Sequence, residues 1–360
     1  MITENSFTKD WLLTVNKNLG WNRQESQLRN LEKAIVALHL LECLAVEQLE
    51  FIFKGGTSLM LLLKKVTRLS VDIDIIIEST IPQLDDIFES VCKKSELFTR
   101  FEKQERDGDS RFSTEHYKFF YAPFADVVDE AYILLDLYTS SNPYANTLEI
   151  EILSDVLDTD GKNMSVCVPD IDSILGDKLT AFAPETIGIS LSAEPGHRPK
   201  RVEVLKQLFD IGNLFDSAES TERIRSTYNT IASHEIHQFG LEIAPDDVLE
   251  DSRRYAYIIG HGGKLEKEKY DTIAKGYKDF SKFVPDLSFD ENNAILAAAK
   301  TAYLVSVLLS NNKVLHKYSN EIDMSEWSIA KTAGYDLNDY KYSNPEAFFY
   351  WYKADEIKLK

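Results

Sequence analysis

The sequence is short of cysteines and of long apolar runs. Its three cysteines, Cys43, Cys92 and Cys167, are spaced too widely for a CxxC metal site or a paired disulfide framework. No run reaches the roughly 18 apolar residues of a membrane span, and the nearest candidate, 294–309, contains a lysine and several alanines. The first residues lack the basic segment and apolar stretch of a secretory signal. We therefore expect a cytoplasmic protein that has no membrane partner.

Positive charge is also scarce. Forty Lys and Arg residues are outnumbered by 59 Asp and Glu residues, which gives the 360-residue chain a net charge of −19. A surface of that sign excludes a protein that coats nucleic acid or anionic membranes through its general field. An RNA partner would need a local basic patch, and the densest basic run is His197-Arg198-Pro199-Lys200-Arg201.

The first half of the chain mixes helix and strand patterns. Apolar residues at every third or fourth position predict a helix over 24–49, and bulky apolar residues predict a short strand at 51–53. Gly55 and Gly56 mark a turn before a helix over 59–65. The remaining patterns predict strands over 71–77, 117–121, 133–138, 148–153 and 165–168, and helices over 81–98 and from 170 onward.

The second half of the chain has an almost entirely helical pattern. Spacings of three to four predict helices over 202–215, 222–239, 246–259, 265–283, 290–310 and 324–333. We therefore predict an α+β fold with two domains. The first, 1–200, combines N-terminal helices with a mixed sheet, and the second, 201–360, is helical.

A glycine turn and two acids form the candidate site. Glycines at Gly55 and Gly56 let the backbone approach phosphate oxygens, and the start of the following helix favours anions. The hydroxyls of Thr57 or Ser58 can donate to the same oxygens. This arrangement is typical of a nucleoside triphosphate site, although a Gly-Gly pair alone is more often only a tight turn.

The run V-D-I-D-I-I-I at 71–77 carries the acids. Its alternation places Asp72 and Asp74 on one face of a strand and Val71, Ile73 and Ile75 on the other. Two carboxylates so placed can share Mg²⁺, which prefers oxygen ligands and neutralises phosphate charge. A strand this apolar is a costly place for acids that have no partner.

These residues resemble a known family. The stretch FKGGTSL…RLSVDIDI resembles the signature of the nucleotidyltransferase superfamily in its AbiEii/AbiGii toxin branch. Two later blocks, 174–181 and 206–211, resemble the family's L-x-[DE]-K-L-x-A and R-D-h-x-D-h helices, although Gln207 replaces the first Asp of the latter. The resemblance implies a polymerase-β-like nucleotidyltransferase fold, in which a mixed sheet with flanking helices precedes a helical C-terminal region. It also implies Mg²⁺-dependent nucleotide transfer and an antitoxin partner.

The resemblance implies a role for each matching residue. Lys178 would reach the triphosphate, as suits a compact ammonium group, and Asp210 would orient it. Arg68 would help to fix the phosphates or the acids. Gly55, Gly56 and Ser58, with Thr57, would hold the triphosphate, and Asp72 and Asp74 would ligate the metal.

The superfamily usually adds a third carboxylate on a neighbouring strand, which joins the metal site and takes the proton from the acceptor hydroxyl. Asp136 is the first choice because it is the sole acid in the apolar run I-L-L-D-L-Y. Glu149 and Glu151, in L-E-I-E-I, are the alternatives, although their alternation is typical of a half-exposed strand.

The resemblance thus implies a toxin of an abortive-infection, phage-defence system. It would transfer a nucleoside monophosphate from an NTP to an acceptor hydroxyl, for which a tRNA end is a candidate and a protein hydroxyl remains open. Two alternatives stay open: a catalytically silent module that binds nucleotide or antitoxin, and a kinase-like phosphotransferase on the same fold.

Overall fold

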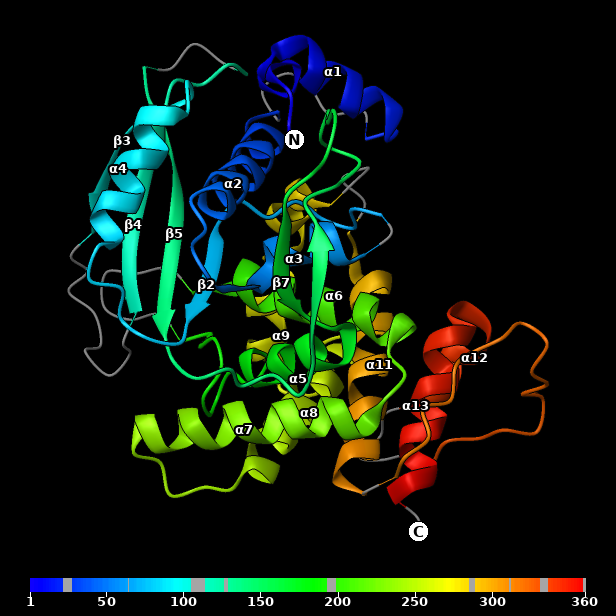
Figure 1. Ribbon diagram of the computed structural model, residues 1–360. Helices are drawn as coiled ribbons and strands as arrows, with labels where there is room; N and C mark the ends of the chain where they lie inside the picture. Colours follow the sequence, from blue (N-terminus) through cyan, green and yellow to red (C-terminus); the bar gives the residue numbers. More distant parts are fainter. Residues whose placement is uncertain are drawn as a thin grey trace. The chain divides into compact units, whose positions relative to one another are not determined.

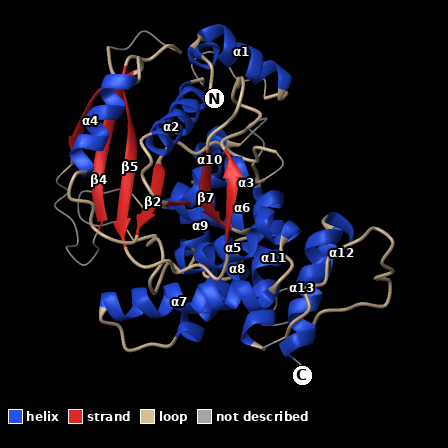
Figure 2. Ribbon diagram, viewed as in Figure 1, coloured by secondary structure: helices blue, strands red, loops and turns tan. Residues whose placement is uncertain are grey.

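The computed structural model describes residues 1–21, 28–63, 65–104, 114–125, 129–192, 199–284, 289–310, 312–330 and 336–358. The chain forms two compact units, whose helices and strands are shown in Figures 1 and 2. An α+β unit comprises Met1–Asp170 and Lys282–Ser288, and a helical unit comprises Ile171–Ser281 and Phe289–Lys360. The predicted α+β class is confirmed.

A seven-stranded mixed sheet forms the centre of the α+β unit, in the order β3-β4-β5-β2-β1-β7-β6. The pairs β2–β5 and β1–β7 are parallel, and the other neighbours are antiparallel. The strands are β1 (Ile52–Lys54), β2 (Ile73–Ile77), β3 (Phe98–Lys103), β4 (Thr114–Tyr121), β5 (Ala131–Thr139), β6 (Thr147–Glu151) and β7 (Ser165–Pro169).

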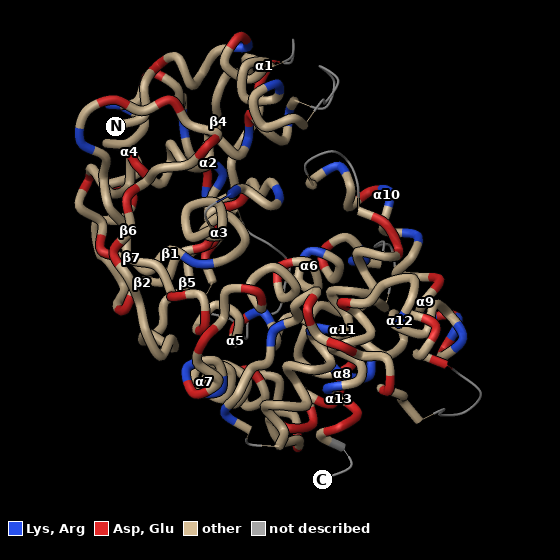
Figure 3. Tube along the Cα trace, turned by 90° about the vertical axis from the view of Figure 1, so that its right-hand side faces the viewer, with Lys and Arg blue, Asp and Glu red and all other residues tan. Residues whose placement is uncertain are grey.

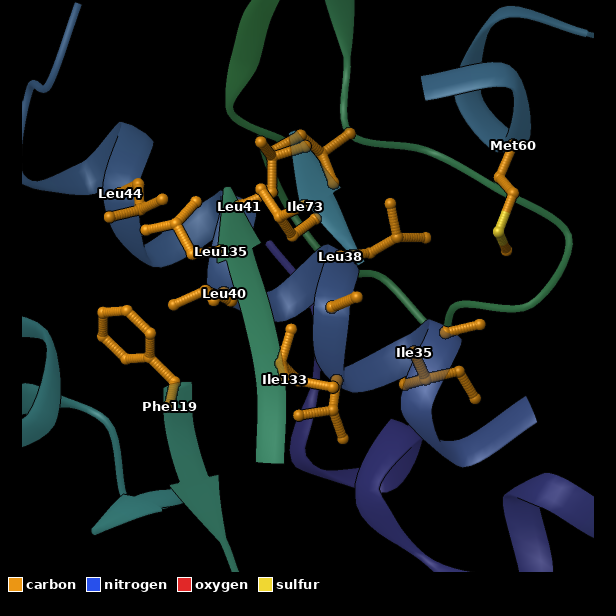
Figure 4. Close-up of a cluster of buried hydrophobic side chains, with 14 of the residues drawn as sticks. Ile35, Leu38, Leu40, Leu41, Leu44, Met60, Ile73, Phe119, Ile133 and Leu135 are labelled. Atoms are coloured by element: carbon orange, nitrogen blue, oxygen red, sulfur yellow. The ribbon is translucent and has the colours of Figure 1, made fainter. Parts of the chain in front are cut away.

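One face of the central strands is buried by helices. α2 (Arg29–Val46) packs on β5, and α4 (Leu84–Lys94) packs on β3. Figure 4 shows side chains of α2 gathered with those of β2, β4 and β5 in one apolar cluster. Along β5 the buried residues are Ile133, Leu135 and Leu137, so the residues between them face the other way. The sheet therefore has an apolar face and a more polar face.

The connection from β1 differs from the prediction. α3 (Gly55–Leu62) begins at the first glycine, directly after β1, whereas the sequence predicted a turn followed by a helix from 59. Gly55 has φ +78°, in the left-handed region that glycine adopts at little cost. This backbone conformation lets the chain pass from strand to helix without a separate turn.

The helical unit begins earlier than the expected boundary at residue 200. α5 (Ile171–Ala181) packs against α6 (Arg201–Ser217) and α7 (Thr221–Phe239), so the units divide after Asp170. The other helices described in this unit are α8 (Pro245–Gly260), α9 (Lys267–Ala274), α10 (Tyr277–Phe280), α11 (Glu291–Leu309), α12 (Tyr340–Ser343) and α13 (Pro345–Lys358).

α11 is the central helix of this unit. It is long and apolar enough to cross a membrane, but 78% of its apolar window is buried, and it packs on α6, α8 and α13. It is therefore a core helix of this unit. The aromatic run on α13 is also core, since Phe348 to Trp351 are almost fully buried.

In the C-terminal part of the chain one predicted helix is wrong and one helix was missed. The helix predicted over 324–333 is not formed in the described part, 324–330, and the remaining residues lie outside the description. The helix α13 was not predicted.

Acidic and basic residues are interspersed along both units, as Figure 3 shows, so neither unit carries charge of a single sign.

Glu32 joins α2 to the segment after β4. It is 2% exposed, and its carboxylate accepts hydrogen bonds from Tyr121 Oη (2.8 Å), Phe124 N (2.9 Å) and Ala125 N. Because Glu32→Gln would turn an accepting oxygen toward these donors into an NH₂ group, we expect the free energy of unfolding to fall by about 2 kcal/mol. Urea denaturation measures the loss. The exposed Glu96→Gln is the control, and an equal effect of the two variants would contradict this role.

Candidate active site

The first turn of α3 lies against the acidic strand β2. Lys54 at the end of β1 is the cross-strand partner of Asp74, and Gly55 follows at once. A Cβ at Gly55 would overlap the Asp74 carboxylate, whose Cγ would lie 2.9 Å away. Only a residue without a side chain fits this close approach of backbone and carboxylate.

Gly56 makes a second close approach in the same turn. A Cβ there would collide with the guanidinium of Arg68, whose Cζ would lie 3.2 Å away, and with Ser70 Oγ, 2.8 Å away. Arg68 is only 4% exposed, and its Nη1 donates to the Leu69 carbonyl over 3.2 Å. The Arg68 side chain therefore contacts both the first turn of α3, at Gly56, and the segment that leads into β2, at Leu69.

The two hydroxyls of the turn are used inside the protein. Thr57 Oγ1 donates to the Asp72 carbonyl over 2.5 Å, and Ser58 Oγ donates to the Gly55 carbonyl over 2.9 Å. Both residues are fully buried. In this structure they tie α3 to the residue before β2 and close the turn, instead of presenting their hydroxyls to a ligand as the sequence suggested.

The sheet register sets polar residues in a row. Asp74 on β2 pairs with Lys54 on β1 and with Asp136 on β5, and Asp136 pairs with His116 on β4. Directly paired residues project from the same face, about 5 Å apart between strands. The row lies on the face opposite the apolar cluster. Asp72 lies just before β2, in the loop and not in the strand itself as the sequence predicted, so the register does not include it.

The register also separates the candidates for the third carboxylate. Asp136 is the immediate neighbour of Asp74, whereas Glu149 and Glu151 lie on β6 at the edge of the sheet. Three strand spacings of about 4.8 Å separate β6 from β2, or about 14 Å. Both glutamates are exposed. The structure thus brings Asp136, and not the glutamates, beside Asp74.

Asp136 already has a partner. His116 Nδ1 lies 2.7 Å from Asp136 Oδ1, and the two side chains are 20% and 18% exposed. The neighbouring acid Glu115 has a different partner. Lys103 Nζ donates a hydrogen bond to it over 2.7 Å, and this bond holds the pKa of the Glu115 carboxyl below its usual range. His116 thus pairs with Asp136 across the strands, whereas Glu115, next to it in the sequence, pairs with Lys103.

Asp72 and Asp74 offer the hard oxygen donors that suit Mg²⁺, and Gly55 places backbone directly at the Asp74 carboxylate. These two residues therefore fit a divalent cation. Across the part of the chain that the structure describes, no group of three or more His, Cys, Asp or Glu side chains is arranged to hold a metal. Asp136 is the cross-strand neighbour of Asp74, but among the described residues the two do not belong to a three-ligand set.

The predicted Lys178 and Asp210 meet inside the helical unit. Lys178 Nζ on α5 lies 3.0 Å from Asp210 Oδ2 on α6, and their side chains are 8% and 0% exposed. A buried ammonium group needs such a partner. The structure thus brings together two residues that the sequence linked only through separate family blocks.

Sequence reasoning missed His116 and did not give Lys54 a role. Strand alternation in T-E-H-Y-K-F-F-Y would have placed His116 on a polar face. The alternation could not say which residue of β5 it would oppose, since that depends on the register.

A comparison with known protein families identifies the family of this chain. The model of the nucleotidyl transferase AbiEii toxin, from type IV toxin–antitoxin systems, matches residues 39–292. The chain belongs to the AbiEii nucleotidyltransferase toxin family. Membership makes it a nucleotidyltransferase and a toxin-family protein, for which an NTP substrate and an antitoxin partner are implied. The family expected from the sequence is confirmed.

Two solved structures are similar at low identity. A candidate nucleotidyltransferase from H. pylori is 16% identical, with a TM-score of 0.44, and the match covers 82% of this chain and 100% of that one. An antigenic nucleotidyltransferase-like protein from Paracoccidioides brasiliensis is 13% identical, with a TM-score of 0.35, and the match covers 61% and 97%. No curated protein matches the chain.

Gly55→Ala tests the close approach in this AbiEii-family site. Gly161, in the loop between β6 and β7, is the matched control because it has a similar φ of +69° but no atom within 4 Å of a built Cβ. Both alanine variants incur a left-handed backbone cost of about 1 kcal/mol. We expect Gly55→Ala to lose more stability in urea and also to lose Mg²⁺-NTP binding. Equal stability losses and intact binding in both variants would contradict the geometry.

Asp210→Ala tests the buried ion pair. It leaves the Lys178 ammonium buried without its partner, so we expect the free energy of unfolding to fall by about 3 kcal/mol. Lys178→Met combined with Asp210→Ala should recover much of this loss but not nucleotidyl transfer, if Lys178 also binds substrate. Denaturation and transfer assays on the full chain separate the two effects. A double variant no more stable than Asp210→Ala would refute the pairing.

Proposed function

We propose that this chain transfers a nucleoside monophosphate from an NTP to an acceptor hydroxyl and releases pyrophosphate, in a Mg²⁺-dependent reaction. The observation that supports this best is the packing of the Gly55 backbone against Asp74, in register with Asp136. A phosphate-accepting helix start, a metal-binding acid and a proton acceptor are then neighbours on one sheet face.

Each residue has one task in this proposal. The backbone amides at Gly55 and Gly56 bind the triphosphate, as helix N-termini do, while Thr57, Ser58 and Arg68 hold the turn in place. Asp72 and Asp74 hold Mg²⁺, which when bound supplies positive charge at the phosphates. Asp136 accepts the proton of the attacking hydroxyl. By its match to the family block Lys178 binds the phosphates, and Asp210 holds its ammonium group.

The acceptor proposed first is an RNA, such as a tRNA end. Part of the basic run 197–201 lies outside the described residues, but Lys118 on β4 and Lys33 on α2 offer further cationic groups near Tyr132 of β5. Lys118 Nζ lies 4.6 Å from the centre of the Tyr132 ring, and Lys33 Nζ lies 5.1 Å from it. Lys118 is on the same strand as His116, two residues along, and therefore on the same face. This supports an anionic acceptor near the polar row.

In the cell, we propose, transfer arrests growth as part of phage defence, and an antitoxin restrains it. A cytoplasmic site of action fits the free thiols of all three cysteines. Induced expression should therefore stop growth, and the same expression of Asp72→Asn should not.

The decisive experiment offers the purified chain Mg²⁺, each labelled NTP in turn, and total RNA or protein. We expect one macromolecule to gain label, with release of pyrophosphate. Asp72→Asn and Asp74→Asn should lower the rate about 100-fold or more, because each removes charge from the metal site. Glu149→Gln, an exposed acid on the edge strand, is the control and should leave the rate unchanged.

Two outcomes would overturn the proposal. Label that never leaves the free nucleotide pool, together with toxicity that survives Asp72→Asn, would indicate a silent binding module. Release of a nucleoside diphosphate in place of pyrophosphate would indicate phosphoryl transfer on the same fold.

A further inference from the structure

The contact between His116 and Asp136 needs an explanation of its own. A half-buried carboxylate beside a metal-binding acid has a histidine nitrogen 2.7 Å from one of its oxygens. Among the described residues, His116 is the side chain that hydrogen-bonds to the Asp136 carboxylate. The strand register keeps the two side chains next to each other, because His116 and Asp136 are directly opposed on β4 and β5.

The same register fixes where Asp136 lies relative to Asp74. Leu135 and Leu137 anchor β5 in the apolar core, and Ile73 and Ile75 anchor β2 there. The strands therefore hold the two acids side by side, but a strand does not fix the rotation of an aspartate about its side-chain torsions. A hydrogen bond to one carboxylate oxygen does so.

We propose that His116 is the positioning residue for Asp136 in nucleotidyl transfer. Its ring donates from Nδ1 to Asp136 Oδ1 and leaves Oδ2 to accept the proton of the acceptor hydroxyl. In that step the O–H bond breaks, the acceptor oxygen bonds to the α-phosphorus, and the bond from phosphorus to pyrophosphate breaks. The proton passes to Asp136 Oδ2. This role rests on the proposed function.

The hydrogen bond leaves the carboxylate able to act as a base. A carboxylate has about four lone-pair sites, and donation from His116 Nδ1 occupies one of them on Oδ1. Both lone pairs of Asp136 Oδ2 therefore stay available for the proton of the acceptor hydroxyl.

Conservative variants at position 116 test the role. Asn places its amide nitrogen near the position of Nδ1, whereas Gln places it near Nε2. We expect His116→Ala and His116→Gln to lower kcat about 10- to 100-fold, the range typical of lost support for a functional ligand. KM for the NTP and the Mg²⁺ concentration for half-maximal rate should change less than about twofold. His116→Asn should restore most of kcat.

Two readouts do not depend on turnover. Nitrogen NMR of the metal-free protein should show the proton of His116 on Nδ1, and Asp136→Ala should remove that preference. The melting temperature of His116→Ala should stay close to that of Thr114→Ala, a same-face control on β4. A large drop in melting temperature with no rescue by Asn would show a purely structural role and overturn the inference.

The remaining outcomes separate this inference from the proposed function. If His116→Ala keeps the full kcat while Asp72→Asn and Asp74→Asn are inactive, the inference fails and the function stands. If all three variants keep full activity, the proposed function fails with it.

Discussion

The burial of one face of β2 and β5 is the constraint on which the site depends. Ile73 and Ile75 on β2, and Leu135 and Leu137 on β5, are all nearly fully buried in the apolar cluster that α2 helps to form. Since side chains alternate along a strand, the residues between them must face the other way. A slip of one residue in either strand would expose the apolar set, so hydrophobic packing holds the acids in place.

The first turn of α3, which begins at Gly55, adds a second constraint. Backbone at Gly55 lies where any side chain would overlap Asp74, and Thr57 ties the carbonyl of Asp72 to the same helical turn. The acids and the start of α3 therefore hold one another in place. The proposed nucleotidyl transfer would need this rigidity, because small displacements of reacting groups cost large factors in rate.

The motif residues were the most predictable part of the site. The spacing of Gly55, Gly56, Asp72 and Asp74 carried both the chemistry and the family resemblance, and the family match confirms that resemblance. Details of the same motif were less predictable. The hydroxyls of Thr57 and Ser58 are consumed by backbone carbonyls, and whether a hydroxyl faces a ligand or the interior depends on packing that local sequence does not specify.

The strand patterns of the first half and the helical periodicity of the second half were sufficient by themselves to determine the α+β class. The enzyme family followed from the resemblance of the glycine pair and the V-D-I-D-I-I-I run to a known signature, which the family match confirms. These are local patterns, set by the geometry of a strand or a helix. Contacts between distant segments were decided only by the tertiary structure. The pairing of Asp136 with His116 and the grouping of α5 with the helical unit depend on sheet register and helix packing. The contact of Lys178 with Asp210 was implied by the family resemblance, but its 3.0 Å distance and its burial are also set by helix packing. No local pattern encodes them, because each is fixed by the combined burial of residues far apart in the chain.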